Sequence, residues 1–87
     1  MPARELQEKL DTLREQLEQN PPLSLEERDE LHKLMEQLDA QIKLENTVPD
    51  TSLVDGVNLA VERFDVEHPA LTQTLRNIVQ TLQSMGI

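Results

Sequence analysis

Short segments that contain proline divide the chain into four stretches, and this division is the strongest constraint on the fold. Pro21 and Pro22 form the first break, Pro49 lies in the second and Pro69 in the third. Proline lacks a backbone N–H and disfavours helical geometry in the residue before it, so a helix ends near each break. Between the breaks, aliphatic residues recur every three or four positions, which is the period of an α-helix. The sequence therefore predicts an all-α fold, in which about four helices form two helical hairpins and a bundle.

The first predicted hairpin, residues 1–46, is narrow and highly charged. Its helices cover about residues 2–19 and 25–46, and each carries aliphatic residues at steps of four, three and four. These seam positions are Leu6, Leu10, Leu13 and Leu17 in the first helix, and Leu31, Met35, Leu38 and Ile42 in the second. A seam of this width matches one partner helix, so we expect the two seams to zip together as a coiled-coil-like hairpin. Ser24 followed by Glu27 predicts a capping box at the start of the second helix.

The second predicted hairpin, residues 50–87, is more apolar. Its helices cover about residues 53–66 and 70–85, and each has a broad aliphatic stripe. Leu59 and Val66 lie seven residues apart on the side opposite the main stripe of the third helix. We expect a single small helical domain over residues 1–87. The spacing leaves open whether the two hairpins pack as one bundle or stand as two arms.

Gly56 interrupts the third predicted helix. Glycine inside a helix costs about 1 kcal/mol relative to alanine. Two explanations are equally open: a neighbouring helix approaches closely at this point, or the helix begins later in the chain.

Composition excludes several functional classes. The net charge is −9 and the chain has only eight Lys and Arg residues, so nucleic acid and anionic membranes are not expected as partners. The chain contains no cysteine, which excludes disulfides, thiolate metal sites and a cysteine nucleophile. No apolar run is long enough to span a bilayer, and the start of the chain is charged rather than signal-like. A cytoplasmic location is therefore expected.

Few residues of the sequence indicate a catalytic or metal-binding site. His32 and Glu36 have the i, i+4 spacing of a pair of metal ligands, but zinc sites usually have more nitrogen or sulfur ligands than this pair offers, and a solvated helix surface is the simpler interpretation. For His68, next to Glu67, a role in the interhelical turn is the simpler interpretation. The paired carboxylates are explained by favourable charge at a helix start. We therefore expect no catalytic residue, no metal ligand and no cofactor, and we do not expect an enzyme.

The fourth predicted helix has an unusual polar face. Outside its aliphatic stripe it carries neutral polar residues, with Arg76 as the only charge. Such a face is easier to desolvate than a charged one, so it is a candidate contact surface, although an ordinary solvated face is the alternative. The predicted interaction residues are Leu59, Val66, Gln73, Asn77 and Gln80.

These features favour a protein–protein interaction or self-association module. A chain of this length has a small core, and this one has a single aromatic residue, so association with a second copy is a common remedy. The expected partner is a second copy, another protein, or both. The alternative is a monomeric regulatory or adaptor protein that docks on one enzyme or transcription factor.

Four segments of the chain are distinctive: the run Leu23-Ser24-Leu25-Glu26-Glu27-Arg28, residues 52–64, the sequence Glu67-His68-Pro69 and the closing Ser84-Met85-Gly86-Ile87. Together they resemble a family of short bacterial helical proteins catalogued as a domain of unknown function. Residues 52–64 are the most specific part. The resemblance implies a bacterial, non-secreted helical protein and supplies no active-site residues.

Overall fold

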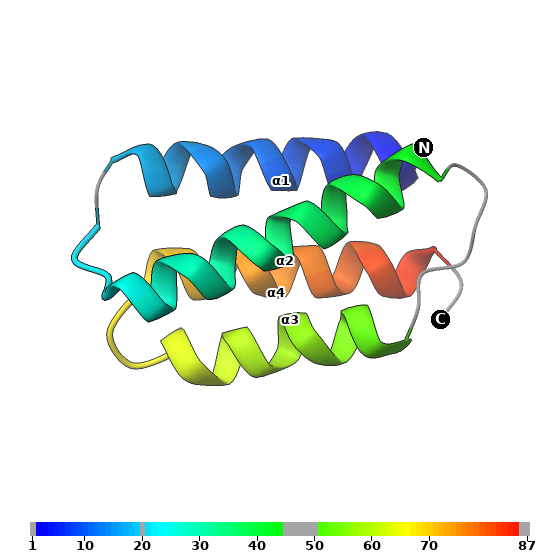
Figure 1. Ribbon diagram of the computed structural model, residues 1–87. Coiled ribbons are helices and arrows are strands. Elements are labelled where there is room, and N and C mark those ends of the chain that lie inside the picture. The colour runs from blue at the N-terminus through cyan, green and yellow to red at the C-terminus, as the bar shows by residue number, and fades with distance from the viewer. Residues whose placement is uncertain (1, 20, 45–50, 86–87) are drawn as a thin grey trace.

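The computed structural model describes residues 2–19, 21–44 and 51–85. Four helices account for most of these residues, which confirms the predicted all-α class (Figure 1). Their bounds are α1 Pro2–Glu18, α2 Leu25–Lys43, α3 Thr51–Phe64 and α4 Pro69–Ser84. The predicted second break, around Pro49, lies outside the described residues.

Local chemistry explains where α2 and α4 begin. The backbone N–H of Glu27 donates to Ser24 Oγ at 3.1 Å, and the backbone N–H of Ser24 donates to Glu27 Oε1 at 2.9 Å. This reciprocal pair is the predicted capping box. Pro69 occupies the first turn of α4, where its missing N–H leaves no hydrogen bond unmade.

The helices alternate in direction and form a ring. Each helix runs antiparallel to the next, and α4 returns beside α1 (Figure 1). Within the described residues, α1 makes no close backbone approach to α3, nor α2 to α4. The resulting bundle is elongated, with extents of 36 × 21 × 18 Å.

One apolar core receives side chains from all four helices, so the two hairpins pack as one bundle. The buried apolar side chains are Leu6, Leu10, Leu13, Leu17, Leu31, Leu34, Met35, Leu38, Leu53, Val54, Val57, Phe64, Leu71, Leu75, Ile78, Val79 and Leu82. Ile42, a predicted seam position, is only partly buried at the edge of this core. The predicted seams therefore identify the buried faces of α1 and α2 almost completely.

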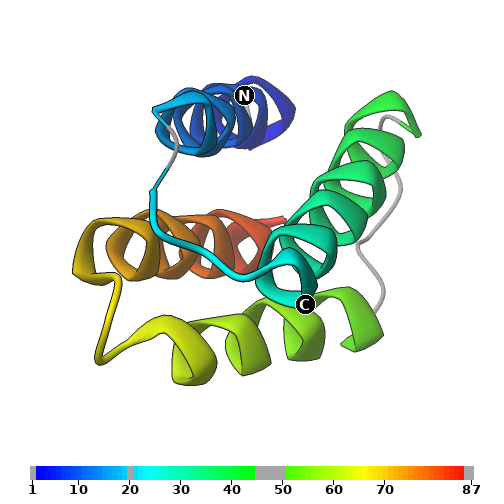
Figure 2. The same cartoon turned by 60° about the vertical axis from the view of Figure 1, so that its left-hand side comes forward.

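The pairing of α1 differs from the expectation. Its contact with α4 is more extensive than its contact with α2, so its leucine seam does not close mainly on the second helix. Figure 2 shows α4 lying between α1 and α3, with α2 to one side. The contact between α1 and α4 includes a hydrogen bond, in which Gln16 Nε2 of α1 donates to the carbonyl of Ala70 at 3.3 Å. Within α4, Thr74 Oγ1 donates to the same carbonyl at 3.2 Å.

Candidate functional site

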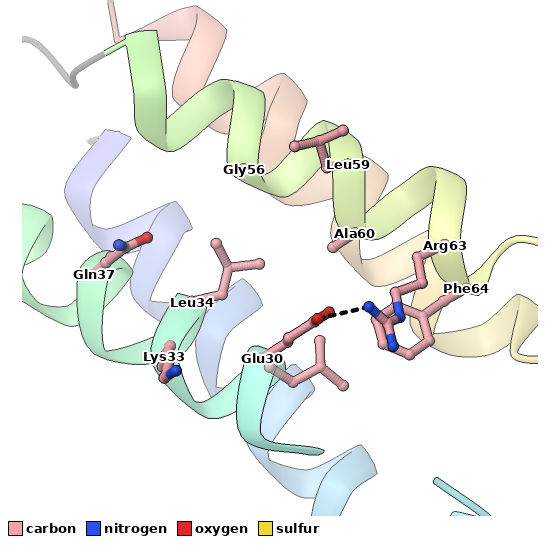
Figure 3. A pocket seen from close by; sticks show the side chains of 10 residues that line it. Glu30, Lys33, Leu34, Gln37, Gly56, Leu59, Ala60, Arg63 and Phe64 are labelled. Atoms are coloured by element: carbon pink, nitrogen blue, oxygen red, sulfur yellow. Dashed lines mark hydrogen bonds and ion pairs between the residues drawn. The ribbon is translucent and has the colours of Figure 1, made fainter. Parts of the chain in front are cut away.

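A groove runs between α2 and α3, on the side where the bundle is least tightly closed. Its main hollow has a volume of about 480 Å³ and is drawn in Figure 3. A second hollow continues along the same two helices as far as Leu44, and both are lined by Gln37 and Gly56. The two hollows form a surface that extends along much of the bundle.

The floor of the groove is apolar and contains small residues. Leu34 of α2 faces Gly56 and Ala60 of α3 across it (Figure 3). A Cβ atom added at Gly56 would meet one described atom, Leu34 Cδ1, at 3.7 Å. That distance is an ordinary van der Waals contact, so packing within the described chain does not require glycine there.

This geometry excludes both explanations of Gly56. The helix begins at Thr51, ahead of the glycine and earlier than predicted, so a late helix start is not the cause. Because α2 leaves room for a Cβ atom, close approach of the neighbouring helix is not the cause either. Gly56 keeps a depression open in the groove at the expense of helix stability.

The rim of the groove combines exposed leucine with charges that are already paired. Leu59 is 66% exposed and Leu44 is 57% exposed. At one end, Arg63 Nη1 contacts Glu30 Oε1 at 2.6 Å (Figure 3). Of the residues lining the two hollows, only Glu30, Lys33 and Arg63 are ionisable, one acidic and two basic. The groove therefore lacks the acidic excess of the whole chain.

The structure separates the predicted interaction residues. Leu59 lines the groove, whereas Val66 is 90% exposed in the turn after α3. Gln73 and Asn77 are joined by a hydrogen bond of 3.2 Å on α4, and Gln80 is exposed on the same helix. These three α4 residues do not line either hollow of the groove, and their role in contact stays a prediction.

Part of the neutral polar face of α4 is used inside the bundle. Thr72, Thr74 and Thr81 are buried. Thr74 lies where Gln16 of α1 reaches the Ala70 carbonyl, and Thr81 is seven residues further on, at the same angular position. This part of the face is covered by another helix of the same chain.

The groove itself was not predicted from the sequence. Each residue of its floor belongs to a helix that was predicted, but the groove depends on the spacing between α2 and α3. The available signal was local: Gly56 and Ala60 lie one turn apart, next to Leu59, which falls outside the main stripe.

A second group of polar side chains lies where α2 begins and α3 turns into α4. Glu27, Glu67 and His68 place one carboxylate or imidazole atom each within 4.8 Å of one another. His68 is 9% exposed, and its Nε2 atom is buried with no hydrogen-bond partner among the described residues. The backbone hydrogen bond from Ser24, with smaller contributions from the Ser24 hydroxyl, His68 and Arg63, holds the pKa of Glu27 below its ordinary value.

His32 has no comparable surroundings. It is exposed on α2, beside a shallow hollow that includes Arg14 and Arg28. Within the part of the chain that the structure describes, His32 and Glu36 belong to no cluster of three possible metal ligands.

Comparisons with known proteins place the chain in a family without assigning it an activity. Among the helices that the structure describes, none combines the length and apolarity that crossing a bilayer requires. Neither the curated proteins nor the solved structures give a match to the chain. A family model described as "Domain of unknown function (DUF4404)" matches residues 6–87, and the chain therefore belongs to the DUF4404 family.

Proposed function

We propose that this protein acts by binding a protein chain rather than by catalysis, and that a second copy of itself occupies the groove between α2 and α3. The observation that carries the proposal is the pairing of a protruding apolar side chain, Leu59, with a depression at Gly56 and Ala60 on the same face. The monomeric adaptor remains the rival interpretation, and the experiment below separates the two.

The shape of the groove supports a second copy as the occupant. In a dimer with twofold symmetry, the same surface serves both partners, so it must be self-complementary. Leu59 of one copy can enter the depression at Gly56 of the other, and the reverse contact then forms at the same time. The room at Gly56 allows the approaching side chain to reach the helix backbone.

Charge supports the same occupant. Two chains of net charge −9 repel each other, and the repulsion is smallest where each presents few unpaired acidic groups. In the groove, Glu30 is neutralised by Arg63 at 2.6 Å, while Lys33 contacts Asp29 at 3.2 Å. This surface can therefore be covered without burying an excess of negative charge.

The test is the mass of the protein in solution as a function of concentration. Sedimentation equilibrium from low to high micromolar concentration is expected to show a monomer–dimer equilibrium for the unaltered chain. Leu59→Glu should shift it strongly to monomer, because it places a charge in the apolar contact. Leu25→Glu is the matched control: Leu25 is 86% exposed at the start of α2 and lines neither hollow.

Gly56→Ala gives a second, independent test. Filling the depression should weaken the dimer, while helix propensity raises the free energy of unfolding of the monomer by about 0.5–1 kcal/mol. If Gly56 served only the fold of the monomer, Gly56→Ala would not weaken the dimer while it stabilised the monomer. A strict monomer at high micromolar concentration, or an unchanged dimer in Leu59→Glu, would reject the proposal. A monomer that loses one dominant cellular partner on Leu59→Glu would establish the adaptor instead.

A further inference from the structure

His68 is an unusually buried histidine for a position in an interhelical turn. The residue is 9% exposed, and its Nε2 atom is buried without a hydrogen-bond partner among the described residues. An unsatisfied buried polar atom is costly, so such atoms in native proteins call for a partner that the protein chain does not itself supply.

The backbone and a neighbouring ring hold His68 in place. The backbone N–H of His68 donates to the Phe64 carbonyl at 2.9 Å, and the backbone carbonyl of His68 accepts from the backbone N–H of Thr72 at 3.0 Å. The Phe64 and His68 rings pack edge to face, with centroids 5.8 Å apart. The imidazole is therefore positioned before any ligand arrives.

Two carboxylates converge on this imidazole from different parts of the fold. Glu27 comes from the first turn of α2 and Glu67 from the turn between α3 and α4. One oxygen of each lies within 4.8 Å of a ring nitrogen of His68. The capping hydrogen bond fixes the Glu27 side chain through Oε1, and its second carboxylate oxygen can still bind another partner. Glu67 is exposed and free to adjust its rotamer.

We propose that Glu27, Glu67 and His68 form a binding site for one divalent transition-metal ion of the zinc class. Zinc binds nitrogen and oxygen ligands at about 2.0–2.1 Å, which sets donor atoms roughly 3.3 Å apart in a tetrahedral site. The three groups reach that spacing by closing in from within 4.8 Å, a movement within the range of side-chain rotation. Water completes the coordination.

The chemistry of the donors selects the class of ion. An imidazole with two carboxylates suits zinc and its neighbours, whereas calcium and magnesium prefer shells made of oxygen alone. Arg63, whose charge acts on Glu27, is already held by Glu30 at 2.6 Å. The ion would join the start of α2 to the α3–α4 turn and supply the partner that the buried imidazole lacks.

Zinc binding to the full chain, without a purification tag and after treatment with a chelator, tests the proposal directly. Zinc chloride is titrated by calorimetry, and cobalt is used in parallel because its visible spectrum reports ligation. One ion per chain is expected, together with a rise in melting temperature. His68→Gln should weaken zinc binding by about tenfold or more, and Glu67→Gln, at an exposed position, should weaken it without disturbing the fold.

His32→Gln is the matched control, since His32 is the only other histidine in the chain and is exposed. Unchanged binding in this variant, with loss in the other two, supports the site. Absence of zinc binding by the unaltered chain overturns the proposal. So does loss of binding in His32→Gln, or full binding in both His68→Gln and Glu67→Gln.

Discussion

Helices α4 and α2 are similar in length and very different in how they are packed. Half of the sixteen residues of α4 are buried, including three threonines, and Arg76 is its only charged residue. In α2, five of nineteen residues are buried, and nine are Asp, Glu, Lys or Arg. Accordingly, α4 has extensive contacts with both α1 and α3, whereas α2 meets each of its neighbours less closely.

The contrast shows that charge density limits how much of a helix can be covered. Threonine can be buried cheaply when its hydroxyl bonds to the carbonyl four residues earlier, as Thr74 does to Ala70 and Thr81 to Asn77, at 3.2 and 3.0 Å. Charged side chains must stay in water, so only a stripe of α2 can be buried. Hollows remain on both flanks of α2, and one of them is the candidate binding groove.

The largest expected effect comes from the core of α4. Leu75→Ala should lower the free energy of unfolding by about 3–5 kcal/mol, because Leu75 is fully buried and its truncation leaves a cavity in the core. Met35→Ala on α2, at the edge of the core, should cost about 2 kcal/mol. Urea denaturation measures both, and equal losses would show that the two helices contribute alike.

Hydrogen exchange should reveal the same contrast without any mutation. Amides of α2 are expected to exchange at least about tenfold faster than those of α4, a difference of about 1.4 kcal/mol in opening free energy. The reason is that α2 contacts its two neighbours, α1 and α3, less extensively than α4 does, so opening α2 breaks less packing. Uniform protection across both helices would mean that the bundle opens as a single unit.

A capping substitution should affect the two helices unequally. Ser24→Ala removes the hydroxyl that accepts from the N–H of Glu27 and should lower the free energy of unfolding by about 1 kcal/mol. Ser84→Ala, the same change at the end of α4, should stay within about 0.5 kcal/mol. Thermal denaturation of the pair measures the difference. A larger loss for Ser84→Ala than for Ser24→Ala would contradict this prediction.

The smallest expected effect concerns the buried hydroxyls of α4. Thr72 Oγ1 has no hydrogen-bond partner among the described residues, so Thr72→Val should raise the free energy of unfolding by about 1 kcal/mol at most. Thr74→Val removes a hydroxyl that is bonded to Ala70 and should lower it by about 0.5 kcal/mol. Chemical denaturation gives both values. Destabilisation by Thr72→Val would indicate that water satisfies this hydroxyl.

The sequence predicts the helices and their buried faces, because proline breaks and aliphatic spacing act over short distances. It does not predict which helix covers which face. The seam of α1 fits a single partner, but nothing in the positions of Leu6 or Leu13 distinguishes α2 from α4. In the structure α1 packs mainly on α4, where Gln16 of α1 donates to the carbonyl of Ala70.

The candidate sites are still less accessible to sequence reasoning. The groove exists because α2 and α3 stand slightly apart, and only the unexplained Gly56 signals it in advance. Glu27 and His68 are far apart in the sequence, and their meeting depends on how the first and second hairpins close together. The sequence alone therefore predicts an ordinary turn residue at His68, because it does not show that His68 is buried.

Phe64 is the single aromatic residue of a chain that has no tryptophan or tyrosine. Its ring lines the groove on one side and packs against His68 on the other. In the aromatic region of a proton NMR spectrum, the only other side-chain ring resonances would be those of the two imidazoles. The chemical shifts of the Phe64 ring would change on binding either in the groove or at His68. The molecule therefore contains its own spectroscopic probe and needs no label.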